Sequence, residues 1–114
     1  AQNQYITTAD INGRRNTVLV DTGANIIAMN MAHARQIGVE LPDQPNGQVA
    51  TASGVVAGYT VFLDSVDVGG IRVRNVQASV LDGAFPQKIL LGMSYLRHVK
   101  MEESDGVLML TSKY

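Results

Sequence analysis

The chain consists mainly of short valine-rich segments in which apolar and polar residues alternate, or in which a few apolar residues follow one another. Such segments are typical of β-strands with one or both faces buried. Dipeptides that favour tight hairpin turns separate them: Asn12-Gly13, Ser53-Gly54, Gly69-Gly70 and Asp105-Gly106. The pattern therefore predicts an all-β fold that is built largely from hairpins.

Two short stretches have helical character instead. The first covers residues 31–37, where Asn30 is a suitable N-cap and Gly38 a suitable stop. The second covers residues 93–99, directly after Gly92. We expect these two helices to be the only ones.

Two parts of the chain share one plan. In the first part, a hairpin leads through residues 18–20 to an Asp-Thr-Gly triplet and then to the first helix. In the second part, another hairpin leads through residues 89–91 to Gly92 and then to the second helix. Valine-rich hairpins resemble one another in many proteins, so the pattern leaves open whether this is an internal duplication or a coincidence.

Length and composition limit the possible functions. With 114 residues, of which 46% are hydrophobic and 17% charged, the chain is predicted to form one globular domain over residues 1–114. A formal net charge of −1 gives no general attraction for a phosphate backbone, so we expect no nucleic-acid partner. The chain has no cysteine, and His33 and His98 lack neighbours at ligand spacing, so we expect no metal site. It has neither a P-loop nor a dinucleotide glycine fingerprint, and we expect no cofactor.

Asp21 is the strongest candidate for chemistry. It follows the apolar run Val18-Leu19-Val20, so a carboxylate is expected at the end of a buried strand, where it loses hydration. Gly23 allows a sharp turn and a close approach by substrate. The structural alternative is an aspartate that begins a turn, and the triplet arises by chance in on the order of a few per cent of chains of this length.

The surrounding motifs distinguish these alternatives, because over nearly its whole length the chain resembles the retropepsin-like aspartic peptidases, and especially their bacterial single-domain members. The matching segments occur in the expected order: residues 9–13, 18–24, 28–29, 34–38, 51–54, 66–71 and 90–96. The resemblance implies a closed β fold of the acid-protease type with two short helices and a flap hairpin. It also implies that Asp21, Thr22 and Gly23 form the catalytic triplet and that Leu90-Leu91-Gly92 supports it from beneath.

A homodimer follows from the resemblance, because the chain supplies one such triplet and the family's chemistry needs two. Two close carboxylates cannot both carry a charge cheaply, so they share a proton, and one acts as base while the other acts as acid. The expected reaction is hydrolysis of a peptide bond by an activated water. A last hairpin, predicted from residues 100–103 and 107–110, is a candidate for dimer contacts.

Residues 48–60 are predicted to form the flap that covers an extended polypeptide substrate. The resemblance implies substrate contacts at Ala24, Asn25, Ala52, Ser53, Gly54 and Ile89. Residues 26–28, Val55 and Val56 are further candidates for apolar pocket walls, although core packing is the simpler role for each.

The chain departs from the retroviral members at two positions. They carry an acid at the position of Asn25 and an arginine at that of Met93, and this chain has neither charge. Because both partners are absent, no buried charge is left alone. A module that keeps the fold for dimerisation or peptide binding, without cleaving anything, is the alternative function.

The cellular setting is suggested by the resemblance alone. The chain begins at Ala1 rather than Met, so we expect a preceding segment. Related bacterial chains follow an export or membrane segment, which suggests the periplasm or a membrane-anchored envelope location.

Overall fold

The computed structural model describes residues 5–51 and 54–113, which form nine strands and two short helices. Seven strands make the main sheet: β1 (Tyr5–Ile11), β2 (Arg14–Val20), β3 (Ile27–Asn30), β4 (Gly47–Thr51), β5 (Gly54–Val68), β6 (Ile71–Leu81) and β7 (Ile89–Leu91). The helices are α1 (Met31–Ile37) and α2 (Met93–Leu96), and a separate C-terminal hairpin contains β8 (Val99–Ser104) and β9 (Val107–Ser112). The predicted all-β fold with two short helices is confirmed.

The hairpin turns form where the sequence predicts them. Both central residues have positive φ at Asn12-Gly13 (51° and 81°), at Gly69-Gly70 (61° and 90°) and at Asp105-Gly106 (53° and 78°). Such turns match the natural twist of paired strands and accept mainly Gly, Asn and Asp. Ser53 lies outside the described residues.

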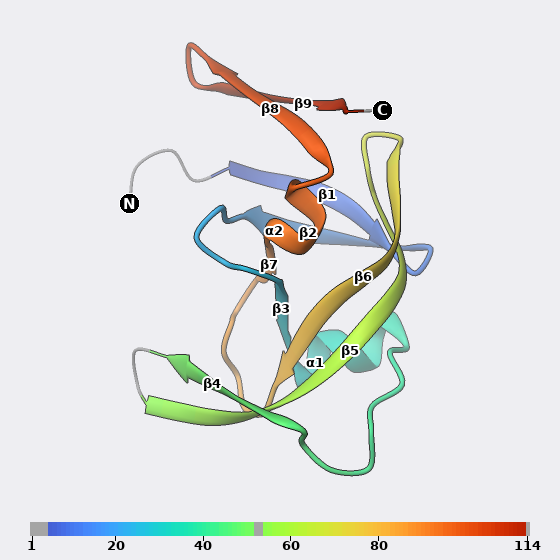
Figure 1. Cartoon of the computed structure of the whole chain (residues 1–114), viewed down its shortest axis with the longest axis vertical. Coiled ribbons are helices and arrows are strands. Elements are labelled where there is room, and N and C mark those ends of the chain that lie inside the picture. Colours follow the sequence, from blue (N-terminus) through green and yellow to red (C-terminus); the bar gives the residue numbers. More distant parts are fainter. Residues whose placement is uncertain (1–4, 52–53, 114) are drawn as a thin grey trace.

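The main sheet has an internal two-fold order. Its strands are arranged β1-β2-β7-β3-β6-β5-β4, and β1 also pairs with β5, which closes the sheet (Figure 1). When β1, β2 and β3 are exchanged with β5, β6 and β7, the order of these six strands simply reverses. The internal duplication is therefore confirmed as a repeat of topology, and each half ends in a helix.

The two halves exchange strands at the centre of the sheet. Strand β2 of the first half pairs in parallel with β7 of the second, and β3 pairs in parallel with β6. The two exchanged strands, β3 and β7, then meet antiparallel where Ala28 faces Leu90. As a result, the two loops that precede β3 and β7 lie at corresponding places: the acid loop (residues 21–26) and the Phe85 loop (residues 82–88).

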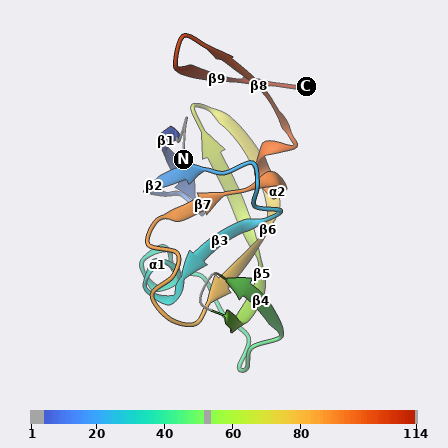
Figure 2. The same ribbon diagram turned by 90° about the vertical axis from the view of Figure 1, so that its left-hand side faces the viewer.

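The core is built from both halves. Fully buried side chains include Ile11, Ile27, Leu63, Leu91 and Tyr95. The β8–β9 hairpin lies at one end of the molecule, whereas β4 and the start of β5 lie at the other (Figures 1 and 2). In the described part of the chain, no helix is long and apolar enough to cross a membrane.

The helix predictions are confirmed for α1 and partly wrong for α2. Helix α1 begins after the N-cap Asn30 and ends at Gly38, whose φ of 82° is left-handed. Helix α2 ends at Leu96 rather than at Val99, because Val99 is buried as the first residue of β8. The last hairpin extends beyond its predicted strands at both ends.

Candidate active site

Asp21 stands at the junction of the two halves. It follows the last residue of β2, and its backbone N–H donates a hydrogen bond to the carbonyl of Leu91 in β7 (N···O 3.0 Å). The carboxylate is half-buried rather than enclosed. The parallel β2–β7 pair therefore fixes the main chain at Asp21 and leaves its side chain accessible.

Hydrogen bonds between residues two or three positions apart shape the acid loop. The Gly23 N–H donates to Asp21 Oδ1 (2.9 Å), and the Ala24 N–H donates to the Asp21 carbonyl (3.2 Å). A side chain at position 23 would begin with a Cβ only 3.3 Å from the same Oδ1. The loop thus turns back on itself and presents the Gly23 N–H to the Asp21 carboxylate.

Residues that begin α2 support the acid loop from beneath. The Met93 N–H donates to the Ala24 carbonyl (2.8 Å). A Cβ at Gly92 would lie 2.3 Å from the Ile26 carbonyl oxygen and 2.8 Å from that of Ala24, which no side chain can accommodate. Of the residues expected to support the loop, Leu91 does so through its carbonyl and Gly92 through its close packing, whereas Leu90 lines the cleft.

Ser94 extends this support to the end of the loop. Its buried hydroxyl accepts a hydrogen bond from the Ile27 N–H (3.0 Å) and donates one to the Gln77 carbonyl in β6 (2.8 Å). One side chain thereby connects the start of β3, the helix α2 and the neighbouring strand. The sequence analysis did not predict this role for Ser94.

A cleft of about 480 Å³ lies in front of the acid loop. Asp21, Gly23, Ala24, Asn25 and Ile26 line one side, and Val49 and Ala50 of β4 line another. The remaining walls come from the strands and loop of the second half: Ser79, Leu81, Phe85 and Leu90, with Ala28 from β3. Asp21 is the one acidic residue among the lining residues of this cleft, and the other side chains are apolar or neutral.

The predicted substrate residues divide into three groups. Ala24 and Asn25 line the cleft, as do Ile26 and Ala28. Ala52 and Ser53 lie outside the described residues, while Gly54 is exposed with a φ of 124° and pairs with Thr51 to continue the β4–β5 hairpin. Ile89 differs from expectation, because it is 2% exposed and packs in the core, and its neighbour Leu90 lines the cleft.

Thr22 points to a different surface. It lines a hollow of about 300 Å³ together with Tyr5 and Val20 on one side and residues of the β8–β9 hairpin on the other: Met101, Glu103 and Leu108. The Tyr5 hydroxyl also donates a hydrogen bond to the Glu103 carboxylate. The second residue of the triplet therefore faces the C-terminal hairpin, while the first and third face the cleft.

Phe85 is a cleft residue that sequence reasoning missed. Phe85 is 53% exposed, and it lines both the cleft and a neighbouring apolar hollow with Leu19, Pro86 and Leu90. The only available signal was a large aromatic residue in a glycine- and proline-containing loop.

The Phe85 loop is held by the first turn of α1. The Asn30 side-chain amide donates to the carbonyls of Pro86 (2.9 Å) and Ala84 (3.4 Å). The His33 ring contacts the Gln87 carbonyl through Nε2 (3.1 Å). Partial burial lowers the pKa of His33 below 6.5, against the opposing effect of the hydrogen bond with the Gln87 carbonyl.

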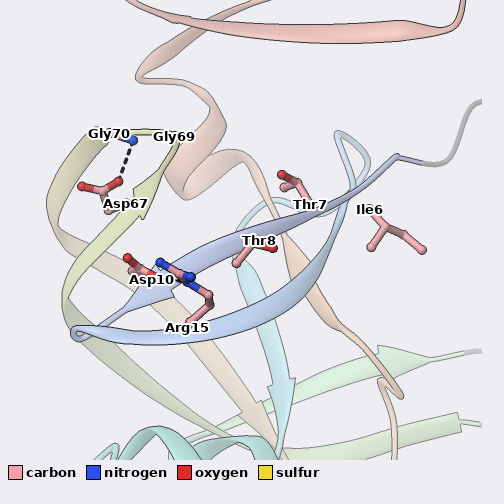
Figure 3. Close-up of a pocket in the computed structure, with 8 residues that line it drawn as sticks. All are labelled: Ile6, Thr7, Thr8, Asp10, Arg15, Asp67, Gly69 and Gly70. Atoms are coloured by element: carbon pink, nitrogen blue, oxygen red, sulfur yellow. Dashed lines mark hydrogen bonds and ion pairs between the residues drawn. The ribbon is translucent and has the colours of Figure 1, made fainter.

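A separate hollow of about 620 Å³ lies between β1 and the β5–β6 turn (Figure 3). Asp10 and Arg15 pair with one another there at 3.4 Å, and Asp67 accepts a hydrogen bond from the Gly70 N–H at 2.9 Å. None of the predicted catalytic residues lines this hollow. Within residues 5–51 and 54–113, no three His, Cys, Asp or Glu residues gather as metal ligands would.

Comparison with known proteins identifies the family. Residues 7–98 match the sequence model of the family described as "gag-polyprotein putative aspartyl protease". The chain belongs to this aspartyl protease family. A Sinorhizobium protein, described as an uncharacterized protein in the cobV 5' region, is 37% identical over 99 residues, which is 85% of this chain. The chain spans 42% of the length of that curated relative.

Solved structures agree with the aspartyl protease family. The crystal structure of a retropepsin-like aspartic protease from Rickettsia conorii has a TM-score of 0.79 and 28% identity, covering 94% of this chain and 88% of that one. EIAV protease in complex with the inhibitor HBY-793 has a TM-score of 0.69 and 20% identity, covering 84% and 88%, and it supports the fold. The retropepsin-like fold expected from the sequence is therefore confirmed.

Proposed function

We propose that this chain is an aspartic endopeptidase that hydrolyses peptide bonds as a homodimer. The observation that carries the proposal is the position of Asp21, whose accessible carboxylate sits on a rigid loop facing a cleft of about 480 Å³. An aspartic peptidase needs a carboxylate that substrate can reach and that the fold holds still. In this proposal, residues 1–114 form one peptidase domain.

Two copies of Asp21 supply both catalytic groups. The ionised Asp21 takes a proton from a water molecule as the water oxygen attacks the peptide carbonyl carbon. The protonated Asp21 of the second copy gives its proton to the carbonyl oxygen, which yields a tetrahedral diol. Transfer of a proton to the peptide nitrogen then allows the C–N bond to break, leaving a carboxyl group and an amine.

The surface around Thr22 supports pairing with a second copy. Thr22 lies next to the β8–β9 hairpin, on which Val107 is 62% and Met109 56% exposed. On the opposite face of that hairpin, Met101 and Leu110 are cross-strand partners and pack against the core. In the proposed dimer this region meets its copy, and the contact covers the exposed apolar residues.

The substrate is an extended polypeptide. Strand β4 is the edge strand of the main sheet and lines the cleft through Val49 and Ala50. An edge strand can pair with an added strand, and the apolar lining of the cleft suits uncharged side chains. The hairpin of β4 and β5 acts as the flap over the bound peptide.

The decisive experiment measures cleavage of a diverse peptide library by the wild type and by Asp21→Asn. The wild type is expected to cleave, with activity that rises faster than linearly with protein concentration because two copies make one site. Asp21→Asn is expected to reduce the rate at least about a hundredfold, since the general acid and base are lost. Asp43→Asn, at an exposed loop aspartate, is the matched control and should retain full activity.

The outcome also distinguishes the alternative function. Cleavage that survives in Asp21→Asn contradicts the mechanism. If the wild type forms a dimer in sedimentation experiments and binds peptides but cleaves none of them between pH 4 and 7, the fold serves as a binding module instead.

A further inference from the structure

The Phe85 loop occupies the same place in the second half of the sheet as the acid loop occupies in the first. Each loop follows the second strand of its half and precedes the strand that crosses to the other half. The Phe85 loop also contributes Phe85 to the cleft that contains Asp21. The position of this loop therefore affects the shape of the proposed substrate site.

The Asn30 side chain forms hydrogen bonds both to α1 and to the Phe85 loop. Its Oδ1 accepts a hydrogen bond from the His33 N–H (2.9 Å), which caps the helix. Its amide nitrogen donates to the carbonyls of Pro86 and Ala84. At 8% exposure the side chain has little contact with water, so these partners replace its hydration.

His33 makes the second link. Its Nδ1 accepts a hydrogen bond from the Asn30 N–H (3.1 Å), so in the neutral ring the proton resides on Nε2, which donates to the Gln87 carbonyl. The ring thus joins the start of α1 to the Phe85 loop one residue beyond Pro86. Both ring nitrogens have partners in this arrangement.

We propose that Asn30 and His33 are positioning residues for the substrate cleft, acting through the Phe85 loop. This inference rests on the proposed peptidase function for its catalytic consequence. Asn30 and His33 touch the main chain on both sides of Phe85 and do not line the cleft. They fix the position of the Phe85 ring in the cleft wall and thereby determine which peptide side chain fits beside that ring.

Helix capping alone does not account for these contacts. A serine at the N-cap would satisfy the helix as well, since only an oxygen acceptor is needed there. The amide donors of Asn30 instead face two carbonyls that are 54 and 56 residues away in the sequence. In the same way, the second ring nitrogen of His33 serves the loop and not the helix.

This division gives variants that separate the two roles. Asn30→Ser keeps an acceptor for the His33 N–H and removes the donors to the Phe85 loop. Gly38→Ala is the matched control, because it strains the other end of the same helix at a φ of 82° without a close contact to the loop. Asn30→Ser is expected to raise KM for an apolar peptide substrate roughly fivefold, as loss of one or two hydrogen bonds implies, with little change in kcat. Gly38→Ala should lower thermal stability and leave KM unchanged.

A conservative variant tests His33 in the same assay. His33→Gln can still accept from the Asn30 N–H and donate to the Gln87 carbonyl, so its KM should stay within about twofold of the wild type. His33→Ala can do neither and should raise KM as Asn30→Ser does. Equal KM values for the alanine variant and the wild type would contradict the assignment of His33.

A double-mutant cycle with Phe85→Ala decides whether the effect passes through the aromatic ring. If Asn30 acts by placing that ring, Asn30→Ser should have no further effect on KM in the Phe85→Ala background. Two effects that simply add would overturn the inference.

Hydrogen exchange provides a readout that does not depend on cleavage. Peptides that cover residues 82–88 should exchange roughly fivefold faster in Asn30→Ser than in the wild type, and no faster in Gly38→Ala. Unchanged exchange in Asn30→Ser overturns the inference even if the chain is an active peptidase. Faster exchange in Asn30→Ser, together with a wild type that cleaves no peptide, would support the positioning role of Asn30 and refute the proposed function.

Discussion

The two halves of the main sheet hold their corresponding loops, the acid loop and the Phe85 loop, with different kinds of contact. In each half, the loop that enters the crossing strand is braced by the helix start of the other half. The acid loop receives backbone contacts from Gly92 and Met93 and one buried hydroxyl from Ser94. The Phe85 loop instead receives side-chain contacts from Asn30 and His33. The corresponding N-cap residues are thus a glycine in α2 and an asparagine in α1.

This difference in contacts indicates which of the two loops can change its shape. Contacts between main-chain atoms at van der Waals distance leave no room for adjustment, so the acid loop has essentially one geometry. Side-chain hydrogen bonds across a gap can be exchanged for others of similar reach. We therefore infer that the loop carrying Asp21 is fixed in shape, whereas the Phe85 loop can vary in shape and in the wall that it gives to the cleft.

The largest expected effect comes from Gly92→Ala. The added Cβ would lie 2.3 Å from the Ile26 carbonyl oxygen, so either the acid loop or α2 must move. Overpacking against a backbone should cost roughly 3 kcal/mol or more of unfolding free energy, measured by urea denaturation. Gly92 has a φ of −96°, which suits any residue, so the cost would come from the contact alone.

Gly70→Ala is the control for that measurement, because it tests backbone strain without a close contact. Its Cβ would meet nothing within 4 Å, but its φ of 90° is left-handed, so a cost of about 1 to 2 kcal/mol from backbone strain is expected. A smaller loss of unfolding free energy in Gly92→Ala than in Gly70→Ala would contradict the inference that the acid loop has one fixed geometry.

The next effect in size is expected for Ser94→Ala. The substitution leaves the Ile27 N–H and the Gln77 carbonyl without their shared partner in a buried position. The expected loss is about 2 kcal/mol of unfolding free energy. Ser104→Ala, on the exposed C-terminal hairpin, should change stability by less than about 0.5 kcal/mol. Similar losses in the two variants would show that the hydroxyl bridge is unimportant.

Tyr95 anchors α2 and gives a smaller effect with a distinct pH dependence. Its ring is fully buried and its hydroxyl donates to the Ile71 carbonyl (2.7 Å), so Tyr95→Phe should cost about 1 kcal/mol. Burial raises the pKa of Tyr95 from 10.0 to about 12. Between these values the unfolded chain has released the phenolic proton and the folded chain still holds it, so stability should fall as pH rises from 10 to 12.

The matching measurement is the melting temperature of wild type and Tyr95→Phe across that pH range. The wild type should lose more stability than the variant, because the variant has no proton to release at this position. Parallel curves would assign the alkaline loss to other groups.

The smallest expected effect is an acid weakening of the contact between α1 and the Phe85 loop. The pKa of His33 is lowered by burial, so the folded chain favours the neutral ring. Below pH 6.5 the unfolded chain binds the proton more readily, and the stability contributed by His33 is lost as pH falls through its lowered folded pKa. The protection of residues 82–88, taken relative to the intrinsic exchange rate at each pH, should therefore fall on acidification in the wild type but not in His33→Gln. An identical response in both would exclude His33 as the cause.

Much of this arrangement could be predicted from the sequence, because it depends on local signals. The Asn-Gly, Gly-Gly and Asp-Gly turns, the cap pair Asn30 and Gly38, and the placement of Asp21 after an apolar strand all act within a few residues. The repeat between the halves was visible for the same reason, since equivalent strands and turns leave equivalent patterns.

The parts that could not be predicted depend on contacts between distant residues. Asn30 was recognised as a helix cap, but nothing near it in the sequence indicates its partners at residues 84 and 86. Ile89 and Leu90 are both apolar, and only the register of β7 between β2 and β3 sends Ile89 into the core and Leu90 to the cleft. The early end of α2 has a similar cause, because Val99 is buried as a strand residue.

The exchange of strands between the halves also has a consequence for how the protein is made. The peptide groups of Asp21 and Ala24 find their hydrogen-bond partners at Leu91 and Met93, about seventy residues later in the chain. Contacts of such long range form late, and a chain emerging from the ribosome folds only with the residues already synthesised. The acid loop therefore cannot take its final shape until nearly the whole of this segment has been released.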